Sequence, residues 1–179
     1  MIAVDTNLLV HAHRADSPRH EAAVAAMRAA GRSANGWAIP WPCAHEFVAV
    51  VTGRAFGEAR TPVTLAFDVL DAWLAHPRCR PIGETDAHGS ILRRLMDRAA
   101  LAGGAVHDAR IAAICIAHGI DELWTSDRDF SRFPDLRTRD PLIPSIHEPD
   151  VPAYAPRGLK APPAPRPARA RTPPARRRP

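Results

Sequence analysis

Short apolar segments alternate with longer amphipathic segments along the first 140 residues, and this alternation restricts the possible folds. Residues 2–5 read Ile-Ala-Val-Asp, which is typical of a buried strand that ends at an acid. Further short strands are predicted at 37–39, 78–80, 122–125 and 136–138. Apolar residues at helical spacing predict helices over 7–14, 17–30, 42–53, 63–75, 86–103 and 106–118. Strands that alternate with helices favour an α/β fold with a parallel sheet.

Three polar residues are predicted to cap helices at their first turn. Ser17 precedes Pro18, and Thr61 precedes Pro62, which is a common arrangement at helix starts. Asp86 is expected to cap the helix that follows it.

Positive charge is concentrated near the end of the chain. Of the 179 residues, the stretch 151–179 holds eight basic residues, nine prolines and no acid. Without those eight charges the net charge of +5 becomes −3 for residues 1–150, so the rest of the chain is not expected to form a broad cationic surface. A segment of this composition cannot bury enough apolar surface to offset its ordering entropy. We therefore predict one folded domain over 1–145 and a disordered Pro/Arg-rich tail over 146–179.

Cysteine usage and apolar runs indicate the compartment. Cys43, Cys79 and Cys115 are far apart and form no CxxC pair, so neither a zinc site nor a disulfide framework is indicated. The first residues lack a basic start and reach Asp5, unlike a signal peptide. No apolar run approaches the roughly 20 residues of a membrane span. We expect a cytoplasmic protein that does not associate with membranes.

Acidic residues lie at the predicted ends of strands and starts of helices. Asp5 ends the first strand, and ligands bind at the carboxyl edge of a parallel sheet. Asn7 is expected to cap the next helix or to orient Asp5. Glu46 shares a helix face with Ala49 and Val50, a face that we predict to be turned toward the core. Helix capping and the helix dipole are the alternative explanations for each carboxylate taken alone.

Asp108 is the most informative of these acids. Apolar residues follow it at i+3, i+4, i+7 and i+8, which places it on the buried face of its helix. A buried carboxylate needs compensation, and Arg110, a helix N-terminus or a metal would each supply it. Asp127 and Asp129 follow the strand at 122–125, where a capped turn is the alternative explanation.

The acids taken together suggest a metal site. Strand ends and helix starts that are far apart in sequence meet at one edge of a parallel sheet, so these carboxylates are expected to converge there. Hard oxygen ligands favour Mg²⁺ or Mn²⁺. Such a cluster performs metal-assisted phosphoryl chemistry, in which the metal activates water and neutralises charge on the leaving oxygen.

Four motifs in this order resemble the PIN-domain family, and in particular its VapC-type ribonuclease toxins. They are Asp5-Thr6-Asn7, His-Glu-Phe around Glu46, His-Asp-Ala-Arg-Ile-Ala-Ala around Asp108, and Thr-Ser-Asp-Arg-Asp-Phe at 125–130. The resemblance covers about residues 1–140 and implies a three-layer α/β/α sandwich with a central, mostly parallel sheet. It also implies Mg²⁺- or Mn²⁺-dependent cleavage of RNA by the toxin of a toxin–antitoxin pair. The implied partners are the RNA substrate, a cognate antitoxin and a second copy of the chain.

The same resemblance implies roles for individual residues. Asp5 and Asp108 would be the principal metal ligands, and Glu46 would be the third acid. The fourth acid would be Asp127 or Asp129, and these two alternatives stay open. Thr6 and Asn7, which follow Asp5 in its motif, would steady that ligand or contact phosphate.

Other functions use similar residues. A flap-type DNA nuclease has related acids, although it needs longer arches and more acids than about 150 residues supply. An aspartyl phosphatase usually has a second Asp where this chain has Asn7. An RNA-binding module with a degenerate site is a further alternative, but its four retained acids would repel phosphate. His45 and His107, each next to a candidate acid, are expected to be solvated or to support that acid, and the four tryptophans are expected in core or dimer packing.

Overall fold

The computed structural model describes residues 1–143, so the predicted tail over 146–179 lies outside the described residues. Five strands form one sheet in the order β3-β2-β1-β4-β5, and all of their pairings are parallel. The strands are β1 (Ile2–Val4), β2 (Trp37–Pro40), β3 (Cys79–Ile82), β4 (Glu122–Trp124) and β5 (Thr138–Arg139). The predicted α/β class with a parallel sheet is confirmed.

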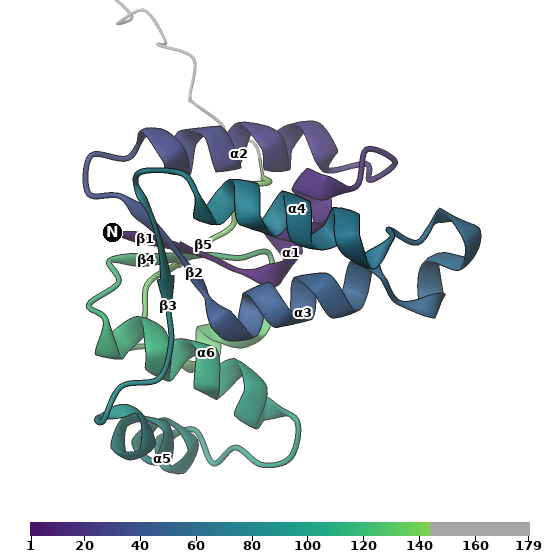
Figure 1. Ribbon diagram of the computed structural model, residues 1–179. Coiled ribbons are helices and arrows are strands. Elements are labelled where there is room, and N and C mark those ends of the chain that lie inside the picture. The colour runs from purple at the N-terminus through teal and green to yellow at the C-terminus, as the bar shows by residue number, and fades with distance from the viewer. Residues whose placement is uncertain (144–179) are drawn as a thin grey trace, which may run out of the picture. The chain divides into compact units, whose positions relative to one another are not determined.

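Helices cover both faces of this sheet. In Figure 1, α2 and α4 lie on one side of the strands, and α5 and α6 lie on the other, which confirms the three-layer sandwich. The helix α3 packs against α1 and α4. The bounds are α1 (Thr6–His13), α2 (His20–Arg32), α3 (Trp41–Val51), α4 (Val63–Leu74), α5 (His88–Arg98) and α6 (Ala105–Ala117), with 3-10 turns η1 (Arg54–Ala59) and η2 (Arg128–Arg132).

The predicted caps at three helix starts are wrong, because α2, α4 and α5 all begin without a side-chain cap. Ser17 Oγ lies 2.8 Å from Nδ1 of His11, and α2 begins three residues after Ser17. Thr61 Oγ1 lies 2.8 Å from Nε2 of His13, and α4 begins without a side-chain cap. Asp86 does not cap α5, which begins two residues later. The predicted segment 86–103 is also too long, since α5 ends before residue 99.

The central strand β1 is buried on both faces. Ala3 and Val4 are fully buried, and the register places Ala3 beside Ala38 of β2 and Leu123 of β4. Helices on both faces of a parallel sheet require apolar residues at successive positions, which explains the Ile-Ala-Val run. The carboxyl end of this strand delivers Asp5 to the edge of the sheet between two neighbouring strands.

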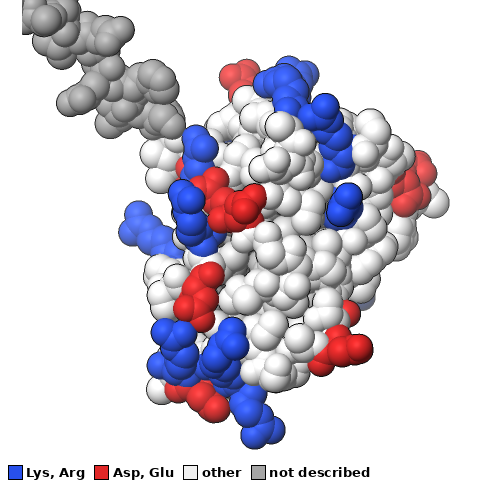
Figure 2. Space-filling view, turned by 90° about the vertical axis from the view of Figure 1, so that its left-hand side faces the viewer, with Lys and Arg blue, Asp and Glu red and all other residues white. Residues whose placement is uncertain are grey.

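The described surface carries charges of both signs. Figure 2 shows basic and acidic side chains interspersed along one side of the face drawn there, with a largely uncharged middle. On this face the described residues therefore present no continuous cationic surface. Within residues 1–143, every helix is too short or too polar to cross a membrane.

Candidate active site

Four of the five predicted carboxylates line one cavity at the carboxyl edge of the sheet. The cavity has a volume of about 310 Å³. Its acidic side chains come from the β1–α1 junction, from α3, from the first turn of α6 and from the segment after β4: Asp5, Glu46, Asp108 and Asp127. The remaining lining residues are Thr6, Asn7, Val10, His11, Val50, Ile111 and Phe130. The topology thus brings together acids that are far apart in sequence.

Asp5 is the most buried acid of the cavity, with only 5% of its surface exposed. It caps α1, and its Oδ1 accepts a hydrogen bond of 2.7 Å from the backbone N–H of Thr6. The Cys43 thiol donates to the same oxygen at 3.5 Å. Burial and the nearby Asp5 charge raise the pKa of this thiol, so it stays protonated as a donor. Capping and membership of the acidic cavity are therefore compatible at Asp5.

Asn7 and Thr125 hold the second oxygen of this carboxylate. Asp5 Oδ2 accepts from Asn7 Nδ2 at 2.5 Å and from Thr125 Oγ1 at 2.7 Å. Asn7 also donates to Thr125 Oγ1 at 3.0 Å and accepts from the backbone N–H of Ser126 at 3.1 Å. Asn7 therefore orients Asp5, which confirms one of its two expected roles. Thr125 belongs to the motif at 125–130 and directly follows β4, but no local pattern predicts its bond to Asp5.

Glu46 lies on the exposed face of α3, so the prediction that it faces the core is wrong. The buried side chains of α3 are Cys43, Ala44, Phe47 and Val51. Glu46 is exposed and its Oε2 accepts a hydrogen bond of 2.7 Å from Thr6 Oγ1. Thr6, from the Asp5-Thr6-Asn7 motif, thus orients Glu46.

Asp108 is half-buried, and Arg110 does not compensate it. The Arg110 guanidinium donates from Nε to Glu84 Oε1 at 2.6 Å instead. The cation that acts on Asp108 is Arg132 of η2, which favours its charged form. Within residues 1–143, the Asp108 carboxylate makes no side-chain hydrogen bond or ion pair.

The structure separates Asp127 from Asp129. Asp127 lines the cavity, and its Oδ1 accepts a hydrogen bond of 2.8 Å from the backbone N–H of Asp129. Asp129 is exposed, does not line the cavity, and pairs with Arg132 at 2.9 Å. The geometry therefore favours Asp127 as the fourth acid of the cluster.

The carboxylates disfavour one another's ionisation. Burial raises the pKa of Asp5, and the charge of Glu46 raises it further, against the hydrogen bonds from Thr125, Thr6 and Cys43. Burial also raises the pKa of Asp108, with added contributions from Asp127, Asp129 and Glu46. A divalent cation would relieve this repulsion.

This repulsion predicts how stability depends on pH in a chelating buffer. A carboxyl group whose pKa is higher in the folded than in the unfolded state costs nothing while both states are protonated. The loss of folding stability begins as the pH rises through the pKa of the unfolded state, and it is complete above the pKa of the folded state. We expect Asp108→Asn to raise the melting temperature at pH 7 in chelator, by an amount that shrinks toward pH 4.

Asp5→Asn is the matched control for that measurement. Both oxygens of Asp5 accept hydrogen bonds, so an amide NH₂ would face donors from Asn7 and Thr125 or from Thr6. We therefore expect Asp5→Asn to leave the melting temperature nearly unchanged or to lower it. An Asp108→Asn melting curve equal to or below that of the unchanged chain at pH 7 would contradict the repulsion argument.

The chemistry of the donor set fits a hard divalent cation. Acids that line one cavity, two of them with raised pKa values, supply the oxygen ligands that Mg²⁺ and Mn²⁺ prefer. Within residues 1–143, no three His, Cys, Asp or Glu side chains are already close enough to form a complete metal-binding group. Mg²⁺ is commonly held by one or two carboxylates together with water, so two ligands from this cavity would suffice.

Comparison with known proteins agrees with the fold and the motifs. The PIN-domain family profile matches residues 2–136. Ribonuclease VapC48 from Mycobacterium tuberculosis is 31% identical over 138 residues, which span 77% of this chain and 95% of that protein. Ribonuclease VapC31 from the same organism is 32% identical over 143 residues, which span 79% of this chain and 100% of that protein.

The fold also matches solved structures. The crystal structure of VapBC2 from Rickettsia felis, bound to a DNA fragment from its promoter, has a TM-score of 0.58 at 21% identity. The match covers 78% of this chain and 98% of that one. The chain belongs to the PIN-domain family. The resemblance to VapC-type proteins inferred from the four motifs is confirmed by the sequence relatives.

Proposed function

We propose that this chain is an endoribonuclease, the toxin of a toxin–antitoxin pair, and that it hydrolyses RNA at the carboxylate cavity. The observation that carries the proposal is the convergence of Asp5, Glu46, Asp108 and Asp127 on one cavity. The names of the VapC48 and VapC31 relatives, both ribonucleases, support RNA as the substrate.

Asp5 and Asp108 are the residues that would hold Mg²⁺ or Mn²⁺. When bound, the metal supplies an activated water and neutralises charge on the phosphate. Without a cation these carboxylates repel the phosphodiester, so binding of RNA at the cavity depends on it. Asn7 and Thr125 keep Asp5 in place, and Thr6 holds Oε2 of Glu46 and leaves Oε1 to accept the proton of the attacking water.

A cleavage assay on RNA and on DNA, with and without chelator, tests the proposal. An endoribonuclease cleaves RNA internally, leaves DNA intact and stops when the chelator removes the metal. Cleavage of DNA instead would favour a flap-type nuclease. Binding of RNA without cleavage would favour an RNA-binding module with a degenerate site.

We propose that a cognate antitoxin inhibits this site. An antitoxin segment that carries an arginine suits the acidic cavity, because a guanidinium pairs bidentately with carboxylates and would displace the metal. The match to the VapBC2 structure supports a partner of this kind. Co-purification with the product of the adjacent reading frame is the direct test.

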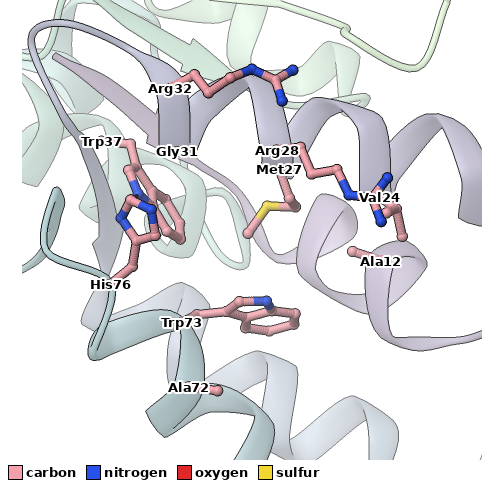
Figure 3. Close-up of a pocket in the computed structure, with 10 residues that line it drawn as sticks. All are labelled: Ala12, Val24, Met27, Arg28, Gly31, Arg32, Trp37, Ala72, Trp73 and His76. Atoms are coloured by element: carbon pink, nitrogen blue, oxygen red, sulfur yellow. Dashed lines mark hydrogen bonds between the residues drawn. The ribbon is translucent and has the colours of Figure 1, made fainter.

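An apolar pocket away from the carboxylates supports a second antitoxin contact. It has a volume of about 390 Å³, and Figure 3 shows Met27, Trp37, Trp73 and His76 around it, with basic side chains of α2 nearby. Its full lining is Ala12, Val24, Met27, Arg28, Gly31, Arg32, Trp37, Ala72, Trp73 and His76. We expect a bulky apolar side chain flanked by an acid to occupy it.

The chain is also proposed to form a homodimer. Val63, Leu65 and Phe67 of α4 are each about half exposed, at 57%, 48% and 48%. Exposed apolar side chains that gather on one helix are characteristic of association surfaces. The molar mass in solution decides this point, and a strict monomer at high concentration would contradict it.

The tail is proposed to add RNA affinity without stabilising the domain. Removal of residues 146–179 is expected to leave the melting temperature unchanged. It should weaken RNA binding most at low salt, because the tail's cations release counterions from phosphate. Binding at two salt concentrations checks this prediction, and unfolding of the shortened chain would show that the domain extends beyond residue 145.

A further inference from the structure

A second cleft adjoins the carboxylate cavity, between α3 and α6. It has a volume of about 430 Å³ and shares Glu46, Asp108 and Ile111 with that cavity. Its other lining residues are Pro42, His45, Ala49, His107 and Arg110. An RNA strand held at the carboxylates would therefore have this cleft beside the bond that is cleaved.

His45 forms part of one wall of this cleft, and Trp41 stacks against it from outside the lining. Trp41 and His45 lie one turn apart on α3, and their rings are stacked with centroids 5.6 Å apart and planes at 30°. Trp41 is 39% exposed, although tryptophan was expected in packing. Its ring lies against the chain after β3, where a Cβ on Gly83 would be 3.4 Å from Trp41 Cδ1. Trp41 thus supports the imidazole that lines the cleft.

The charges of this cleft are unsuited to a phosphate group. Glu46 and Asp108 on its border repel anions, and the Arg110 guanidinium is already paired with Glu84. The exposed imidazoles of His45 and His107 offer flat faces and polar edges instead. Unstacked bases of single-stranded RNA bind proteins by stacking on aromatic rings and by hydrogen bonds at their edges.

We propose that this cleft binds the nucleobase next to the cleaved phosphodiester, stacked on His45. The inference rests on the proposed RNA cleavage and adds a base subsite to it. Trp41 is a positioning residue that acts through His45. The base at this position of the RNA then contributes to the choice of cleavage site.

The test removes the base and its stacking partner separately and together. The probe is a single-stranded oligoribonucleotide that spans a cleavage site mapped after expression in cells, with one abasic nucleotide placed at each position in turn. For the unchanged chain, one abasic position beside the cut should lower kcat/KM by about 5- to 100-fold, the contribution of one base–aromatic stack. On intact RNA, His45→Ala should lower kcat/KM by the same factor. On the abasic RNA, His45→Ala and the unchanged chain should have almost the same kcat/KM.

The conservative variants supply matched controls. His45→Phe and Trp41→Phe keep a stacking ring and should restore most of the activity that His45→Ala and Trp41→Ala lose, while all four melt at similar temperatures. The base subsite alone would be overturned if His45→Ala and Trp41→Ala cleaved intact RNA at the wild-type rate. It would also be overturned if the loss caused by His45→Ala were as large on the abasic RNA as on intact RNA. Weaker antitoxin binding with unchanged cleavage would reassign the pair to a protein contact. A chain that cleaves no RNA would overturn both the subsite and the proposed function.

Discussion

Asp108→Asn is expected to abolish RNA cleavage and to relieve growth inhibition when the chain is expressed in cells. A metal contributes several kcal/mol of charge stabilisation in the transition state, and about 4 kcal/mol corresponds to roughly a thousandfold in rate. The change is nearly isosteric, and within residues 1–143 the Asp108 carboxylate makes no side-chain hydrogen bond that the amide would lose. Single-turnover rates on one RNA, with Mg²⁺ varied, measure the loss.

Two further variants make this result specific. Asp68→Asn on α4 removes the same charge from an exposed position that lines neither cavity, and it should leave cleavage unchanged. Asp5→Asn should be as inactive as Asp108→Asn, but in chelator it should not share the higher melting temperature expected of Asp108→Asn. Full cleavage by Asp108→Asn, or by the unchanged chain in excess chelator, would rule out a metal-dependent nuclease.

Asp127→Asn is expected to impair cleavage strongly, while Asp129→Asn is expected to have little effect. Asp127 lines the cavity, whereas Asp129 is exposed and paired with Arg132. We expect Asp127→Asn to lose about 10- to 100-fold, the range found when a residue that tunes a metal site is changed. Excess Mn²⁺ should restore part of this loss, because higher metal occupancy compensates for the missing charge.

The two variants are well matched. An asparagine at 127 keeps an oxygen that can still accept from the backbone N–H of Asp129, so the turn into η2 survives. Circular dichroism and the melting temperature should therefore agree between them. The reverse order of activities would make Asp129 the fourth acid and would require η2 to move toward the cavity when RNA or metal binds.

Sequence patterns were most reliable where a local rule sets the structure. The apolar run before Asp5 predicted the buried strand, since a strand covered on both faces needs apolar residues at successive positions. Residues 106–118 predicted α6 to within a residue at each end. The helix starts were less predictable, because a hydroxyl can cap a helix or bond elsewhere. Ser17 and Thr61 bond to histidines that the fold brings near them.

The sequence by itself determined the α/β class, the alternation of strands and helices, and the motifs that place the chain in the PIN-domain family. Those properties depend on residues that are close together along the chain. Only the tertiary structure decided how the acids are held: Thr125 reaches Asp5 because β4 pairs with β1, and no local pattern specifies that strand order. It also placed Asp127, but not Asp129, in the lining of the cavity, and it placed Glu46 on the exposed face of α3. Each of these depends on which distant elements pack together, and therefore on the free energy of the whole fold.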